Sequence, residues 1–168
     1  GGPVGDRGGR GHRAWVADIV GRDFETWDMM EGRDVTRVAD AMRLAGVEDA
    51  SIGSIVSTSA FEHIEQPWKA AAQMARVTKP GGMVYVCAPF TFAFHEQPKD
   101  YWRFSPDALR VLFARNYDEV SCGWVSELAS YYYGRRKGAG GEEAAIETAL
   151  AIPGLIVEEE LRFLYRQA

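Results

Sequence analysis

The stretch that most constrains the fold is "MVYVCAPF", residues 83–90. An uninterrupted run of apolar, β-branched and aromatic residues is typical of a strand covered on both faces, as strands of parallel sheets are. The segment before it, Gln66 to Val77, has Trp68, Ala72 and Ala75 at helical spacing, and the following "KPGG" breaks that helix. A helix leading directly into a doubly covered strand predicts an α/β fold.

Other segments continue the alternation of strands and helices. A helix is expected from Ser105, because Ser105 suits the N-cap and Pro106 the first turn. Strands are predicted over residues 14–20, 34–40, 51–57 and 117–125. We therefore expect a Rossmann-like, doubly wound, mostly parallel sheet with helices on both faces.

The predicted domain organisation is an α/β domain over residues 1–126 and a C-terminal extension of the same domain over residues 127–168. The extension is expected to be partly flexible, because "YYYGRRKGAGGEE", residues 131–143, has the composition of an exposed loop.

Composition excludes several classes of protein. The chain has 168 residues and a formal net charge of −5, which disfavours a nucleic-acid partner. Cys87 and Cys122 lie in apolar runs without metal-type spacing, so we expect two reduced, buried thiols in a cytoplasmic protein. No apolar run approaches the roughly 18 residues that a membrane-spanning helix needs.

Candidate functional residues follow the predicted strands. Parallel sheets bind ligands at the carboxyl ends of their strands. This rule places Asp18, Asp40, the junction from Ser57 to His63 and the loop from Pro89 to His95 along one rim.

The central segment resembles a class I S-adenosylmethionine-dependent methyltransferase of the type 11-like group. The family pattern is a strand, a Glu-His pair, an "R-x-x-K-P-G-G" motif and a strand ending in Pro. This chain has Glu62, His63, Arg76, residues 79–82 and Pro89 at those places. The later "HEQPKDYWRFSPDAL" resembles a segment of many small-molecule methyltransferases of this group, and the likeness covers roughly residues 14–125.

The resemblance implies a binding site for S-adenosylmethionine. It assigns the ribose hydroxyls to Asp18 and the adenine amine to Asp40 with Ala41. Ser57 and Thr58 at the end of a strand belong to the same implied site. The alternative for Asp18 and for Asp40 is that each is an ordinary turn residue.

The family's glycine-rich loop is matched only by Gly1, Gly2 and "PVGDRGG", without the strand that normally precedes it. Because a doubly wound sheet needs that strand for backbone pairing, we expect the domain to be truncated at its N-terminus.

The Glu-His pair has several interpretations. In some quinone-pathway relatives a Glu three residues earlier joins the pair as a metal ligand, but Ser59 stands there, so we expect no metal. Glu62 is expected to shape the site, near a helix N-terminus. His63 and His95 are the candidate catalytic bases, and the alternative for His63 is packing or a backbone hydrogen bond.

The loop after Pro89 supplies the candidate substrate-binding residues His95, Asp100, Tyr101 and Arg103. The alternative is that Arg103 pairs internally while the neighbouring aromatic side chains close the core. Phe90, Phe92 and Phe94 alternate, so they either line a pocket or pack at a sheet edge.

The resemblance implies methyl transfer to a small molecule: a sugar, a secondary metabolite or a lipid-linked precursor. One alternative is an inactive methyltransferase-like domain that serves as a binding scaffold. A nicotinamide-dependent enzyme is less compatible, because "GGPVGDRGGRG" matches its glycine motif poorly. We expect no nucleic-acid partner and no membrane span, and a homodimer is possible.

Overall fold

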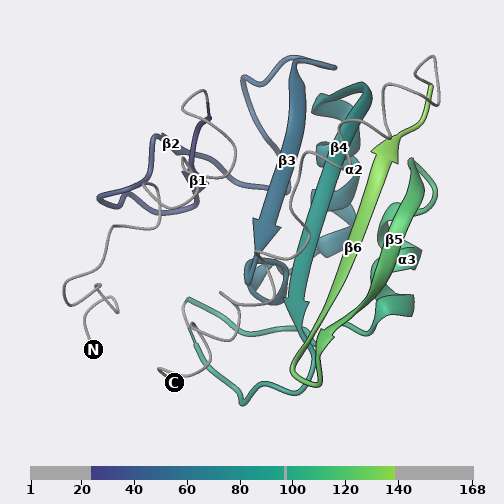
Figure 1. Ribbon diagram of the computed structural model, residues 1–168. Coiled ribbons are helices and arrows are strands. Elements are labelled where there is room, and N and C mark those ends of the chain that lie inside the picture. The colour runs from purple at the N-terminus through teal and green to yellow at the C-terminus, as the bar shows by residue number, and fades with distance from the viewer. Residues whose placement is uncertain (1–23, 97, 139–168) are drawn as a thin grey trace.

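A four-stranded sheet forms the centre of the computed structural model, which describes residues 24–96 and 98–138 (Figure 1). Its strands run in the order β3-β4-β6-β5, and a separate two-stranded sheet pairs β1 with β2. The elements follow the chain as β1 (Trp27–Asp28), β2 (Arg37–Val38), β3 (Ile52–Thr58), the 3₁₀ helix η1 (Phe61–His63), α2 (Pro67–Val77), β4 (Thr78–Pro89), α3 (Pro106–Phe113), β5 (Tyr117–Ser126) and β6 (Ala129–Arg136).

The main sheet contains both parallel and antiparallel strand pairs. β3 and β4 are parallel and joined through α2, as predicted. β6 is antiparallel to both β4 and β5. Antiparallel neighbours need only a short hairpin, and β5 and β6 are joined by Glu127 and Leu128 alone. The described part of the sheet is therefore mixed, within the α/β architecture that the sequence predicts.

Both described helices pack on the same side of the sheet (Figure 1). The core between them contains Ala71 and Met74 of α2, Leu109 of α3, and Val84 and Val86 of β4. In α3 the Ser105 hydroxyl accepts a hydrogen bond from Ala108 N at 3.2 Å, which confirms the predicted N-cap. None of the described helices has the length and apolarity to cross a membrane.

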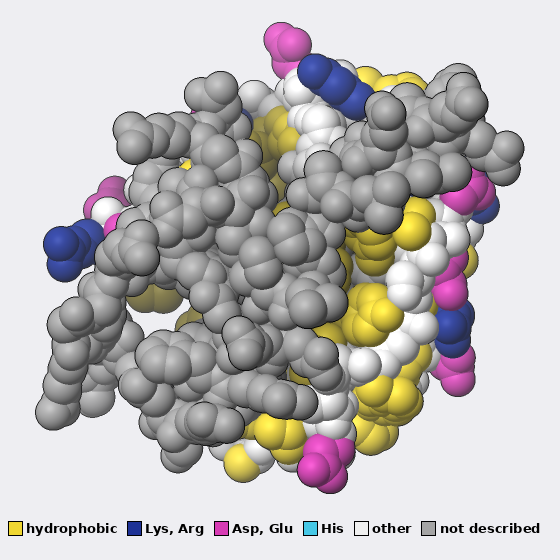
Figure 2. All heavy atoms as spheres, viewed as in Figure 1, with side chains coloured by type: hydrophobic (Ala, Val, Ile, Leu, Met, Phe, Trp, Pro, Cys, Tyr) yellow, Lys and Arg dark blue, Asp and Glu magenta, His cyan; other side chains and the backbone are white. Residues whose placement is uncertain are grey.

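The other side of the sheet also carries hydrophobic side chains. Tyr85 of β4 stacks on Tyr131 of β6 at 6.1 Å between ring centroids, and Cys87 packs in the same cluster. Figure 2 shows hydrophobic side chains, in yellow, on the visible part of the described residues. Both cysteines are unpaired, as predicted, although Cys122 is only half-buried.

β6 is the main difference from the sequence-based expectation. An exposed loop was predicted from residue 131, but residues 131–136 belong to a strand whose Tyr132 is fully buried. The prediction took Gly134 as a turn residue, but it lies inside the strand, where neighbouring atoms leave no room for a side chain. A Cβ at Gly134 would lie 2.7 Å from Tyr132 Cε1 and 3.0 Å from Asp118 O.

Other expectations differ in extent. The strand predicted over residues 34–40 is reduced to Arg37–Val38, which pairs only with β1. β4 begins earlier than predicted, at Thr78, so that "KPGG" lies within the strand, and the register of β3 with β4 shifts between Ile52 and Ser54. The strand predicted over residues 14–20 lies outside the described residues.

Candidate active site

The site begins where β3 ends. Ser59 adopts a left-handed backbone conformation, with φ of 49°, and its N–H still donates to Cys87 O at 3.0 Å. The chain then turns into η1, where Phe61 enters the core and meets Phe104 edge-on. This anchor directs the next residue, Glu62, to the inside of the molecule. The sharp turn at Ser59 is therefore what carries a carboxylate under the rim of the sheet.

Glu62 is a fully buried carboxyl group, with 1% of the residue exposed. Its backbone carbonyl accepts hydrogen bonds from Tyr101 N at 2.7 Å and Trp102 N at 3.3 Å, which ties η1 to the loop before α3. Oε1 lies 3.6 Å from His63 Nε2, whereas Oε2 has no hydrogen-bond partner among the described residues. Burial raises the pKa of Glu62 above its usual range, and a backbone hydrogen bond and nearby His63 offset this only in part.

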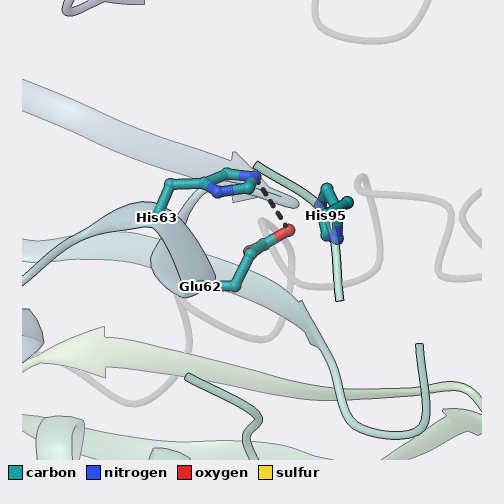
Figure 3. A group of neighbouring side chains, drawn as sticks. All are labelled: Glu62, His63 and His95. Carbon is teal, nitrogen blue, oxygen red and sulfur yellow. Dashed lines mark ion pairs between the residues drawn. The ribbon is translucent and has the colours of Figure 1, made fainter. Parts of the chain in front are cut away.

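The two histidines face this carboxyl group from different segments. His63 follows Glu62 in η1, and His95 lies in the loop after β4. Their rings meet edge-on with centroids 4.9 Å apart. One ligand-type atom each from Glu62, His63 and His95 lies within 4.8 Å of the others, and Figure 3 shows the side chains converging.

Hydrogen bonds fix the orientation of both rings. His63 Nδ1 lies 2.5 Å from Lys99 O. His95 Nδ1 lies 3.1 Å from Ala93 O and 3.3 Å from Asp100 Oδ2. The backbone bond expected as the alternative for His63 is therefore present, while its Nε2 faces Glu62.

Asp100 and Arg103 brace the loop that carries His95. The Asp100 side chain is 1% exposed and accepts from Arg103 NH1 at 2.5 Å, Arg103 NH2 at 2.7 Å and His95 N at 2.7 Å. These bonds, above all those from Arg103, hold the pKa of Asp100 well below its usual range. Arg103 also donates to the backbone carbonyls of Phe92 and Ala93. The internal pairing of Arg103 considered from the sequence is thus observed.

The neighbouring aromatic residues divide between core and surface. Phe104 is buried, and Trp102 Nε1 donates to Ile64 O at 3.0 Å. Tyr101 and Phe94 are exposed. Phe90 meets Trp124 of β5 edge-on at 4.8 Å. Together with Ser126 and Glu127, this pair lines an open hollow at the same rim.

Sequence reasoning missed the far side of this hollow. Trp124, Ser126 and Glu127 sit at the β5–β6 hairpin, whose second strand was not predicted. The signal available in the sequence was a Trp near the end of the strand predicted over residues 117–125.

The residues assigned to donor binding are described only in part. Gly1, Gly2 and Asp18 lie outside the described residues. Ser57 and Thr58 are half-buried at the carboxyl end of β3. Asp40 and Ala41 lie on the segment that follows β2, where Ala41 packs against the main core.

The Asp40 carboxylate has one firmly bound oxygen and one weakly paired oxygen among the described residues. Oδ1 accepts from Met42 N at 2.8 Å, which fixes the side chain in its turn. Oδ2 lies 3.6 Å from Nε of Arg43, whose own side chain is 82% exposed. A weakly paired oxygen of this kind fits the recognition of a ligand amine.

The arrangement is suited to handling protons and to holding a positively charged or electron-poor centre. Buried Glu62 and one ring nitrogen each of His63 and His95 lie within 4.8 Å of one another, while Asp100 and Arg103 keep the geometry fixed. The structure thus brings together His63 and His95, the two predicted bases, across two loops at the rim.

Comparison with known proteins finds similarity to methyltransferases. The sequence profile of the family described as "Methyltransferase domain" matches residues 8–86. An uncharacterized methyltransferase from Mycobacterium leprae is 44% identical over 46 residues, which are 27% of this chain and 17% of that protein. The matched segment thus spans less than a fifth of the relative's length.

Two solved structures share the fold. One is the Burkholderia thailandensis 1,6-didemethyltoxoflavin-N1-methyltransferase with bound S-adenosylhomocysteine, at a TM-score of 0.62 and 14% identity, covering 77% of this chain and 68% of that one. The other is a SAM-dependent methyltransferase from Aquifex aeolicus, at a TM-score of 0.56 and 13% identity, covering 73% and 74%.

Proposed function

We propose that this chain, which carries a class I S-adenosylmethionine-dependent methyltransferase domain, transfers a methyl group to a small-molecule acceptor. The observation that carries the proposal is the convergence of His63 and His95 on buried Glu62 at the carboxyl rim of β3 and β4. Ligands of such sheets bind at this rim.

S-adenosylmethionine is the methyl donor of this family, and the described residues fit it. Asp40 has the acceptor oxygen that an adenine amine needs, and Ala41 keeps the adjoining surface apolar. We assign the ribose hydroxyls to Asp18 and the methionine part to the backbone at Gly1 and Gly2. We assign Ser57 and Thr58, at the carboxyl end of β3, to the same donor site.

When bound, S-adenosylmethionine supplies a methyl group on a sulfonium, which is displaced in line. A lone pair of the acceptor forms the new bond to carbon, and the carbon–sulfur pair goes to sulfur. His63 and His95 can hold the proton that the acceptor loses at Nε2, because Nδ1 of each ring already faces a backbone carbonyl.

A sugar, a secondary metabolite or a lipid-linked precursor is the proposed acceptor. The hollow lined by Phe90, Trp124, Ser126 and Glu127 combines aromatic walls with two polar groups at the same rim. Exposed Tyr101 is available for direct contact, whereas Asp100 and Arg103 act by holding the loop.

Donor binding is the direct test. Calorimetry of the full-length protein with S-adenosylhomocysteine should show binding that weakens about tenfold or more in Asp40→Ala, by loss of a charge-assisted hydrogen bond. Asp107→Ala, which removes an exposed carboxylate on α3, is the matched control and should bind normally. Absence of binding by the wild type would overturn the proposal in favour of an inactive scaffold.

Turnover is measured by mass spectrometry of metabolites incubated with labelled methyl donor. His95→Ala should reduce labelling strongly while donor affinity stays within a few-fold, because the side chain acts on the acceptor. Equal loss of donor affinity and turnover would remove His95 from the proposed role.

A further inference from the structure

We propose that Glu62, His63 and His95 bind one divalent first-row transition-metal ion of the zinc class. The three side chains come from two separate segments and present their ligand atoms within 4.8 Å of one another (Figure 3). The sequence-based expectation of no metal depended on Ser59 standing where a carboxylate would be needed. His95 supplies a third ligand that is distant in the sequence.

The ring orientations are those that metal-binding histidines adopt. A backbone carbonyl only accepts hydrogen bonds, so Nδ1 of His63 must carry the proton that it shares with Lys99 O. The same reasoning applies to His95 Nδ1, which faces Ala93 O and Asp100 Oδ2. In a neutral imidazole with this proton on Nδ1, Nε2 carries a lone pair. A ligating histidine has this arrangement, with the other ring nitrogen donating to a carbonyl or carboxylate.

One oxygen of the carboxyl group between the rings lacks a hydrogen-bond partner among the described residues. This oxygen is Oε2 of Glu62, which is buried, whereas Oε1 lies 3.6 Å from His63 Nε2. A buried carboxylate with one oxygen lacking a described donor thus lies beside two ring nitrogens. Buried polar atoms are nearly always satisfied, so either a proton, carried by Glu62 or by a histidine ring, or a metal cation must complete the group.

A cation accounts for more of the geometry than a proton does. A proton satisfies Glu62 and His63 but gives no reason for His95 to approach them. It also gives no reason for Asp100 to support the His95 ring. Asp100 is itself buried and held by Arg103, which makes a carboxylate–histidine pair of the kind that supports a metal ligand.

The spacing and the ligand types select the metal. Ligand atoms around a tetrahedral ion lie roughly 3.3 Å apart when bonds are about 2.0–2.1 Å long. The 3.6 Å between His63 Nε2 and Glu62 Oε1 is already close to this value. Two imidazoles and one carboxylate suit zinc, iron or cobalt and disfavour magnesium and calcium, which prefer oxygen ligands. Three protein ligands leave one position for water or a substrate oxygen.

This inference depends on the three side chains and not on the proposed methyl transfer. If a metal were held by both rings, an acceptor hydroxyl at the open position would lose its proton more easily, and solvent water in place of the histidines would take that proton. Metal binding and donor binding are measured separately, so either proposal can fail alone.

Metal content and affinity test the site. Full-length protein stripped with chelator is titrated with Zn²⁺ and, separately, with Mg²⁺, and Co²⁺ is added to follow its visible absorption bands. We expect one Zn²⁺ per chain, an intense Co²⁺ spectrum typical of low coordination number, and no measurable response to Mg²⁺.

Matched variants separate this site from adventitious binding. Glu62→Gln, His63→Gln and His95→Gln should each weaken Zn²⁺ binding at least tenfold. Glu65→Gln, the same change at an exposed residue nearby, should bind like the wild type. His12→Ala removes the third histidine of the chain and should also have no effect.

Circular dichroism of each variant establishes that it is folded before titration. The proposal is overturned if the wild type binds no Zn²⁺ or if folded Glu62→Gln and His95→Gln retain its affinity. Loss of binding in His12→Ala alone would equally refute it, since the ion would then be bound elsewhere.

Discussion

Replacing Asp100 with Asn should destabilise the fold much more than the same change in an outwardly similar ion pair. Asp100 and Arg103 are three residues apart, and so are Asp107 and Arg110. The Asp100 side chain is 1% exposed, whereas that of Asp107 is 89% exposed. The two substitutions therefore make one chemical change in opposite environments.

The magnitude follows from the bonds that Asp100 accepts. Asn keeps one acceptor oxygen but turns an NH₂ group toward Arg103, which loses a charged partner. Breaking a buried pair costs about 3–5 kcal/mol. The Arg103 side chain is 25% exposed and regains some hydration, so we expect a loss of about 2–3 kcal/mol in the free energy of unfolding.

The pH dependence gives a second readout. The folded-state pKa of Asp100 is lowered, so its stabilisation is complete above the unfolded-state pKa of about 3.9 and is lost as pH falls toward the folded value. The difference in stability between wild type and Asp100→Asn should therefore be largest near neutral pH and shrink below about pH 4.

Urea denaturation at several pH values measures both effects. Asp107→Asn should stay close to the wild type throughout. Equal stabilities for Asp100→Asn and the wild type at pH 7 would refute the reasoning, because the buried pair would then contribute no more than an exposed one.

Two further substitutions test the core of the site and of the sheet. Glu62→Gln should stabilise the metal-free protein at neutral pH, because burial raises the Glu62 pKa and ionisation favours the unfolded state; this gain should vanish below about pH 4 in urea titrations. Gly82→Ala should lower the thermal midpoint markedly, because its Cβ would lie 2.4 Å from Gly53 O across β3 and β4. A midpoint unchanged by Gly82→Ala would mean that the two strands are not paired as described.

The elements predicted best were those whose signals are local. Ser105 and Pro106 mark the start of α3, and the helix begins there because the hydroxyl caps it. The continuous apolar run of β4 indicated a doubly covered strand, and Val84 and Cys87 are buried. β6 was not predicted from the sequence, because Gly134 and two arginines follow its tyrosines. Only the neighbouring strands show why a glycine is needed at that position.

The site was predictable in position but not in detail. The rule for parallel sheets correctly placed the Glu62–His63 junction and the His95 loop at one rim. The edge-on contact between the rings depends on Asp100 and Arg103 folding the loop back, which no local pattern reveals. Whether Asp18 joins Asp40 at the donor stays a prediction.

The position of β6 has a consequence for synthesis on the ribosome. This strand is made after β4 and β5 but lies between them. Until residues 129–136 leave the exit tunnel, β4 and β5 both lack β6, the strand that pairs with each of them in the described sheet. Until β6 is synthesised, the nascent chain therefore exposes a strand edge that can pair with another chain. Slow translation of residues 129–136 would prolong this exposure.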